Sequence, residues 1–157
     1  MKDKLIIILG AVFGVVILIV LLLLLGGSKK TTCKLVSNQT KNGYSLETQY
    51  EIYSKNNIVN KVVIHETITS DSKDKLEKFE KDFNEQYETL KTNYGGYTYK
   101  VTNKNNKITT EVTINYGKFN MEKFIKNNEA MKQYTKKNKL TLEGAKDLYE
   151  RSGAECK

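Results

Sequence analysis

Residues 44–69, YSLETQYEIYSKNNIVNKVVIHETIT, decide the fold. Between residues 44 and 54 apolar and polar side chains alternate, which is typical of a strand with one buried face. Residues 58–69 form a second run rich in β-branched side chains, and residues 55–57 between the two runs indicate a turn. The stretch therefore predicts an antiparallel β-hairpin.

The period of the pattern changes after this hairpin. In residues 71–94 the large apolar side chains recur at steps of three and four, at Leu76, Phe79, Phe83, Tyr87, Leu90 and Tyr94. Lysine and glutamate fill the positions between them, so the segment predicts an amphipathic helix of about six turns. Gly95 and Gly96 follow and are suited to ending it.

A second hairpin follows this helix. Residues 97–101 and 108–116 both alternate, with a turn at 103–107. Asn120 is expected to cap a second helix through Met131, and Thr141 a short last helix.

These elements define the expected fold class. The sequence predicts an α+β domain in which an antiparallel sheet of two hairpins is packed by the long amphipathic helix and one or two C-terminal helices. We also expect a short strand at residues 32–37 beside the first hairpin.

An apolar run precedes the domain. Residues 5–25 are 21 consecutive positions without a charge, enough to cross a hydrocarbon core of about 30 Å. A cleaved signal peptide has a shorter apolar region of about 7 to 15 residues. We therefore expect residues 1–28 to be an uncleaved single-pass anchor with a short linker, and residues 29–157 to be the domain. Gly10 and Gly14 allow close helix pairing, although glycine is simply common in membrane helices.

Two observations disagree on the orientation of this anchor. The lysines that follow the apolar run outnumber those that precede it, which favours a cytoplasmic domain; they are Lys29, Lys30, Lys34 and Lys41, against Lys2 and Lys4. Cys33 and Cys156 are the two cysteines, one near each end of the domain, and indicate a disulfide. Such a bond persists outside the cytosol. We expect the bridge and an extracytoplasmic domain; the alternative is two unrelated thiols.

Part of the chain resembles a known family. The run Tyr94-Gly-Gly-Tyr-Thr-Tyr, the strand at residues 108–116 and the helix start Phe119-Asn-Met-Glu-Lys-Phe are similar to the YehR-like small bacterial cell-envelope lipoproteins. The similarity extends from about Gly43 to about Met131. It implies a secreted domain held at the outer face of a membrane, in a family of unknown function, and it transfers no site residues. This chain lacks the family's lipid-attachment cysteine.

The residues that carry chemistry are few. His65 is the one histidine, it lies on the strand face opposite Val62 and Ile64, and it has no second histidine with which to build a metal site. The carboxylates of residues 71–94 are explained by pairing with lysines one helical turn away. We therefore expect no cofactor, no metal and no catalysis. The alternative is an envelope hydrolase or redox enzyme that uses His65 or the cysteines.

The charge points to anionic partners other than nucleic acid. Lysine and arginine number 26 against 18 acids. Lys100, Lys104 and Lys107 surround the second hairpin turn, and no acid lies between Lys91 and Glu111. We expect this patch to contact anionic lipid or wall polymer; the alternative is a merely solubilising surface. The sequence thus predicts a membrane-anchored bacterial cell-envelope module, noncatalytic, binding or structural, at the outer face of the cytoplasmic membrane. It specifies neither ligand nor oligomeric state.

Overall fold

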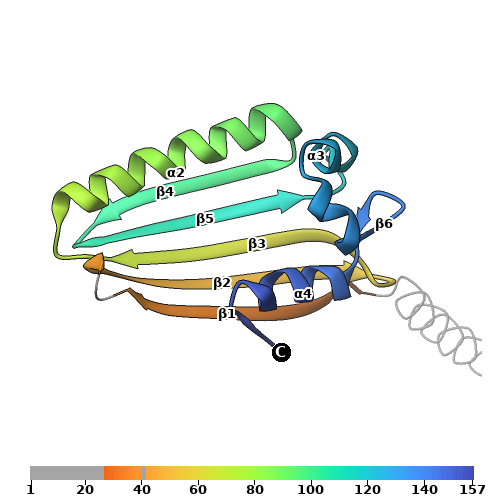
Figure 1. Ribbon diagram of the computed structural model, residues 1–157, viewed down its shortest axis with the longest axis horizontal. Helices are drawn as coiled ribbons and strands as arrows, with labels where there is room; N and C mark the ends of the chain where they lie inside the picture. The colour runs from red at the N-terminus through yellow and green to blue at the C-terminus, as the bar shows by residue number, and fades with distance from the viewer. Residues whose placement is uncertain (1–26, 40–41) are drawn as a thin grey trace, which may run out of the picture.

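The computed structural model describes residues 27–39 and 42–157 (Figure 1). Within these residues a six-stranded antiparallel sheet has the order β4-β5-β3-β2-β1-β8. Its strands are β1 (Lys29–Gln39), β2 (Tyr44–Lys55), β3 (Ile58–Thr69), β4 (Tyr97–Lys104), β5 (Lys107–Asn115) and β8 (Glu155–Cys156). The helices are α2 (Lys73–Tyr94), α3 (Met121–Asn127) and α4 (Leu142–Arg151). The predicted α+β architecture is confirmed.

Asparagine pairs make the two predicted hairpin turns. Asn56 and Asn57 have φ angles of 51° and 61°, and Asn105 and Asn106 have 55° and 58°. Positive φ at both central residues defines the two-residue turn whose twist matches that of the flanking strands. Asparagine tolerates this conformation better than other residues with a side chain.

The helices lie on one face of the sheet, as expected. We call this the covered face and the other the open face. The covered face receives alternate residues of every long strand, such as Ile52, Val62 and Val112, each without exposed surface. The open face receives the residues between them. Helix α2 packs over β4 and β5, and α4 packs over β1, β2 and β3.

Helix α2 is capped at both ends, and it ends at the predicted Gly95. The Ser72 hydroxyl accepts from the backbone N–H of Lys75 at 3.4 Å, and the Gly95 N–H donates to the Lys91 carbonyl at 2.9 Å. Gly96 then turns the chain with φ 72°. A Cβ at this position would lie 2.7 Å from the Asn115 carbonyl oxygen, so the close return of β4 beside β5 requires glycine here.

The expected second helix is shorter than predicted. It ends at Asn127 as α3, and a 3₁₀ helix, η2 (Glu129–Tyr134), carries Met131 instead. Asn128 causes the break, because its φ of −141° is not helical and its side-chain Nδ2 donates to the Phe124 carbonyl at 3.0 Å. A small hairpin of β6 (Thr135–Lys136) and β7 (Lys139–Leu140), absent from the prediction, leads into α4.

The two ends of the domain meet at the β1 edge. Strand β1 is longer than the predicted 32–37, and β8 pairs with it so that Cys33 faces Cys156. The predicted disulfide joins these two residues. The backbone groups of Thr32 and Lys157 exchange hydrogen bonds of 3.0 and 2.8 Å beside it. The C-terminal strand thereby covers part of an edge that would otherwise present unpaired backbone groups.

The predicted membrane helix at residues 5–25 lies outside the described residues, as do Gly10 and Gly14. Among the helices of residues 27–39 and 42–157, none has the length and apolar character needed to cross a bilayer.

Candidate functional site

A row of polar side chains crosses the otherwise apolar covered face. Thr48 on β2, Glu66 on β3 and Thr110 on β5 are direct neighbours across the strands. Both threonines are almost fully buried, at 1% and 3% exposure. The row separates a large apolar cluster around Ile52, Val62 and Val112 from a smaller one formed by Ile68, Leu76 and Ile108. Because burying a carboxylate is costly, Glu66 is the residue of this face that packing alone does not explain.

Glu66 is held by two hydroxyl groups. Tyr87 of α2 donates its O–H to Glu66 Oε2 at 2.5 Å, and Thr110 donates to the same oxygen at 2.8 Å. No described residue donates to the other oxygen, Oε1. No buried side-chain oxygen among the described residues lacks a partner, so Oε1 reaches solvent. Glu66 therefore has one oxygen fixed by the fold and one that is accessible.

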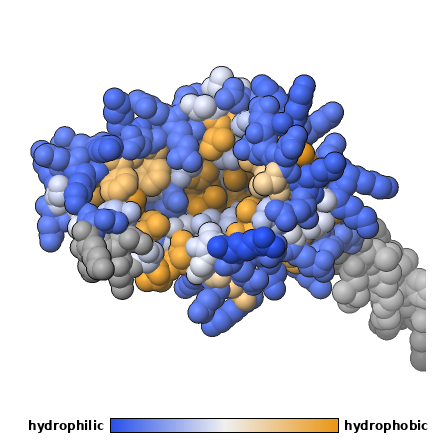
Figure 2. Space-filling model, in the orientation of Figure 1, coloured by the Kyte–Doolittle hydropathy of each residue, from blue (hydrophilic) through white to orange (hydrophobic). Residues whose placement is uncertain are grey.

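The covered face is hollowed between its helices. Figure 2 shows a depression with hydrophobic residues in it, between α2 and α4 as placed in Figure 1. Tyr149 of α4 stacks on Tyr50 of β2 with ring centroids 4.0 Å apart, and Phe83 stacks on Tyr87 of α2 at 5.8 Å. Aromatic side chains of both helices thus border the strands that carry the polar row.

The tyrosine hydroxyls near Glu66 remain protonated at neutral pH. Burial raises the pKa of Tyr50, and the charge of Glu66 raises it further. The same two causes, in the same order, raise the pKa of Tyr87, and its hydrogen bond to Glu66 adds to them. These hydroxyls act as hydrogen-bond donors and acceptors, not as anions.

His65 lies on the open face, as the strand pattern predicts. It is exposed and is the cross-strand neighbour of Gln49 and Glu111. A shallow depression of about 280 Å³ includes His65, Glu111 and Lys100. Glu66 also borders this depression. Its carboxylate is bonded to Tyr87 and Thr110 on the covered face, so it points away from the His65 ring. The described residues contain no group of three or more potential metal-ligating side chains.

The structure separates the other candidates that the sequence singles out. Cys33 is completely buried and bonded to Cys156. Lys100, Lys104 and Lys107 are exposed on the open face around the β4–β5 turn. Lys104 and Lys107 are cross-strand neighbours, but Lys100 faces Glu111. The charge that looks uncompensated along the sequence is therefore partly compensated across the strands.

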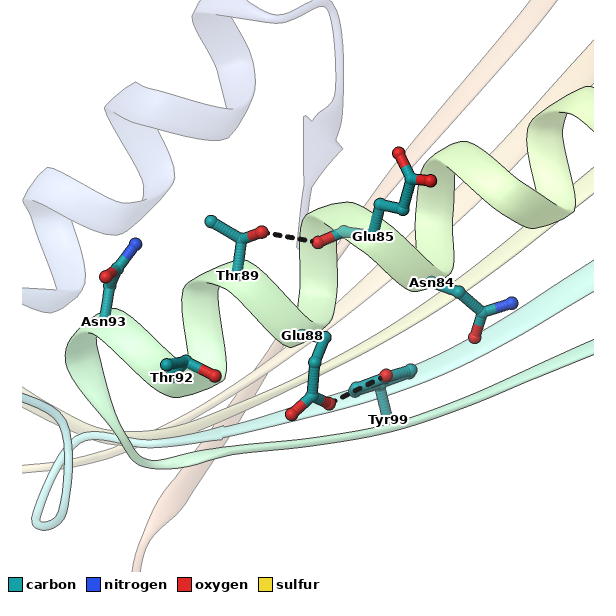
Figure 3. A pocket seen from close by; sticks show the side chains of 7 residues that line it. All are labelled: Asn84, Glu85, Glu88, Thr89, Thr92, Asn93 and Tyr99. Carbon is teal, nitrogen blue, oxygen red and sulfur yellow. Dashed lines mark hydrogen bonds between the residues drawn. The ribbon is translucent and has the colours of Figure 1, made fainter.

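A third depression lies between α2 and the edge strand β4 (Figure 3). It measures about 760 Å³. Its polar groups bind one another: Tyr99 donates to Glu88 at 3.0 Å, and Thr89 donates to the Glu85 carbonyl of its own helix at 2.7 Å. These side chains do not converge on a common point, so we do not assign a site there.

Sequence reasoning missed Glu66. The alternation that places Ile64 and Ile68 on the inner face also places Glu66 there. A charged residue at an inward position was the available signal. The hydroxyl partners could not be found this way, because Tyr87 and Thr110 are 21 and 44 positions distant.

Comparison with known proteins supports the fold. No family model matches the chain, and no curated protein matches it. The NMR structure of the E. coli YehR protein, a structural-genomics target, is similar with a TM-score of 0.51 and 18% identity, over 83% of this chain and 92% of that one. An NMR structure of a protein from Streptococcus pneumoniae TIGR4 has a TM-score of 0.48 and 13% identity, over 83% and 85%.

The likeness to YehR confirms at the level of fold the resemblance seen in the sequence. At this identity it shows the class of fold and nothing of activity.

Proposed function

We propose that this chain is a membrane-anchored bacterial cell-envelope protein whose domain binds a small ligand, without catalysis, in the hollow of the covered face. The observation that carries the proposal is Glu66, a partly buried carboxylate that keeps one oxygen accessible. A protein that needed only a stable sheet would gain by an apolar residue at this inward position.

The chemistry of the hollow selects the ligand class. An accessible carboxylate oxygen favours a cation or a strong hydrogen-bond donor. The aromatic rings of Tyr50, Phe83 and Tyr149 nearby favour an apolar or aromatic body. The ligand proposed is therefore an organic ammonium compound with a hydrophobic portion.

Two probes with the same ring and opposite charge test this ligand class. Phenethylamine and 3-phenylpropionate would be titrated separately into the full chain in detergent, while the backbone amide signals of Thr48, Glu66 and Thr110 are followed by NMR. We expect shifts with the amine and none with the acid. The variant Glu66→Gln should lose the response, and the matched open-face variant Glu111→Gln should keep it. Equal responses to both probes, or a response that survives Glu66→Gln, would contradict the proposal.

Anchoring and outward placement rest on separate evidence. The uncharged run at residues 5–25 supports an anchor. The disulfide between Cys33 and Cys156 supports a location outside the reducing cytosol. Carbonate extraction tests the anchor, since an anchored chain stays in the pellet. Labelling of cells with a membrane-impermeant thiol reagent tests the location: labelling that requires prior reduction is expected, and free labelling without reductant would overturn the bridge in the cell.

The noncatalytic role is also a proposal. His65 lies exposed on the open face, whereas Cys33 is completely buried and bonded to Cys156, so the groups named for an enzyme do not share one site. Replacing His65 by Ala should leave any cellular phenotype of the protein intact. A lost phenotype with a fully folded chain would favour the enzyme instead.

The patch of Lys100, Lys104 and Lys107 is proposed to contact an anionic wall polymer. The first described residue, Gly27, precedes β1, whose Lys29 pairs with Ser54 at the end of β2. The β4–β5 turn lies at the opposite end of the sheet (Figure 1). The patch would then point away from the anchoring membrane.

A further inference from the structure

A second set of lysines gathers at the end of the sheet where the chain leaves Gly27. They come from three separate segments: Lys29 from the start of β1, Lys55 from the end of β2, and Lys136, Lys137 and Lys139 from the β6–β7 hairpin. All are exposed. We call this set the Gly27-end cluster.

Packing brings these segments together. A pocket of about 320 Å³ is lined by Gly27, Lys29 and Lys55. The N–H of Leu142 donates to the Asn57 carbonyl at 3.0 Å, which fixes the start of α4 against the β2–β3 turn. Lys139 lines a neighbouring pocket with Ile58. The cluster therefore surrounds the β2–β3 turn.

Little negative charge offsets the cluster. No carboxylate of the described residues is within ion-pair distance of Lys29, Lys136, Lys137 or Lys139. Glu51 is engaged by Lys30 at 2.6 Å. Glu143, in the first turn of α4, also borders this end and offsets one charge.

We infer that the Gly27-end cluster docks onto the anionic headgroups of the bilayer that holds the chain. This inference rests on the proposed anchor. Leu25 ends the uncharged run, and at most about 14 Å of chain separates it from Lys29. Lys29 would therefore lie within about two Debye lengths of the bilayer at physiological salt. The other lysines of the cluster lie at the same end of the sheet.

The same distance argument excludes Lys104 and Lys107, at the other end of the sheet, from contact with the headgroups. Strand β3 has 12 residues, so the two ends of the sheet are about 40 Å apart. Lys104 and Lys107 would be several Debye lengths farther from the headgroups. They provide a natural control of equal charge on the same domain.

Lysine acetylation of the full chain in lipid nanodiscs tests the inference. One preparation contains phosphatidylcholine alone and the other includes phosphatidylglycerol, and peptide mass spectrometry reports the rate at each lysine. With anionic lipid, the rates at Lys136, Lys137 and Lys139 should fall about fivefold. The difference should vanish at about 1 M salt, where the Debye length is about 3 Å. Lys104 and Lys107 should react equally in both preparations.

Two matched triple variants separate this surface from charge in general. The first carries Lys29→Glu, Lys136→Glu and Lys139→Glu; Lys137 is left in place because its acetylation is the readout. In this variant anionic lipid should no longer slow the acetylation of Lys137. The second carries Lys100→Glu, Lys104→Glu and Lys107→Glu, and anionic lipid should still slow the acetylation of its Lys137.

The failures of the two proposals are distinguishable. A chain that inserts into nanodiscs but is acetylated at Lys137 equally in both lipids overturns the docking and leaves the anchor intact. Protection of Lys104 and Lys107 in place of the cluster also overturns the docking. A chain that inserts into neither nanodisc overturns the anchor, and the docking with it.

Discussion

The two faces of the sheet use neighbouring residues for different purposes. Val62 is completely buried and Val63 is half-buried on the open face; His65 is exposed, whereas Glu66 is partly buried beneath α2. Val62 and Val63 are identical side chains, so strand parity alone sets their different burial. The covered face determines stability and carries the candidate ligand site, and the open face carries charge. The first three of the following predictions compare a change on one face with a matched change on the other, and the last two test one face each.

The largest effect is expected from the disulfide. Replacing Cys33 and Cys156 by Ser should lower the free energy of unfolding by about 4 kcal/mol, because the unfolded chain regains the freedom of a very long loop. Urea denaturation followed by tyrosine fluorescence measures it. Val36→Ser is the open-face control on the same strand, where the valine is 65% exposed, and should change little. A loss of similar size in both variants would remove the role assigned to the bridge.

The two valines of β3 offer a direct test of burial. Val62→Ala should cost about 2 kcal/mol, since it leaves a cavity under the helices. Val63→Ala should cost less than about 1 kcal/mol. Thermal or urea unfolding of both variants gives the comparison. Equal costs would mean that the open face is covered in solution.

Glu66 on β3 and Glu111 on the adjacent strand β5 together test the polar row. Glu66→Gln should destabilise the domain by about 1–2 kcal/mol, because the amide is a weaker acceptor for the hydroxyls of Tyr87 and Thr110 than the carboxylate. Glu111→Gln, on the open face, should change stability by less than about 0.5 kcal/mol. Urea denaturation of both variants measures the two changes in the free energy of unfolding. A neutral or stabilising Glu66→Gln would show that the two hydroxyl contacts add no net stability to the fold.

Tyr97 makes the covered face sensitive to high pH. Burial, with a smaller contribution from Tyr94, raises the pKa of Tyr97 to about 12. The folded state therefore holds this proton more tightly than the unfolded state does. The resulting stability is complete below about pH 10 and is lost as the pH rises from 10 through about 12. Unfolding measured across this range should show a shallower decline for Tyr97→Phe than for the wild type, and an unchanged slope would contradict the assignment.

The smallest effect is expected at the β4–β5 turn. Replacing Lys100, Lys104 and Lys107 by Gln should change stability by less than about 0.5 kcal/mol, because all three are exposed. The same variant should bind less to an anionic wall polymer, and less steeply with salt. Sedimentation with isolated cell wall provides the measurement. If the variant binds the cell wall as well as the wild type does, and without dependence on salt, these lysines serve only to keep the surface soluble.

Local periodicity was sufficient to predict most of the fold. The hairpins and α2 follow from apolar spacing, and the cap at Thr141 follows from a side chain that bonds to nearby backbone. Two predictions failed because a short segment departs from the pattern around it. Asn128 ends α3 early, since its side chain bonds to the Phe124 carbonyl of the last helical turn. Lys137 and Asn138 form a hairpin turn that no alternating pattern announces. Strand β8 has two residues and depends on pairing with a distant partner.

The candidate site was less predictable than the fold, for a physical reason. The parity of β3 places Glu66 inward, but its significance depends on donors from α2 and β5 that only the tertiary structure brings together. The lysine patch illustrates the opposite error. Along the chain Lys100 has no nearby acid, yet the pairing of β4 with β5 places Glu111 beside it. Sequence distance is a poor guide to charge neighbourhoods in a sheet.

The bridge at the β1 edge also has a mechanical consequence. Tension on a tethered domain would pass through Gly27 into β1, which pairs with β2 along all of its 11 residues. Strand hydrogen bonds are perpendicular to the chain, so such a pull shears them together instead of opening them one at a time. Cys33 then transfers tension covalently to Cys156, one residue from the last. With the bond intact, stretching the two termini apart cannot extend the chain between cysteines separated by 123 positions.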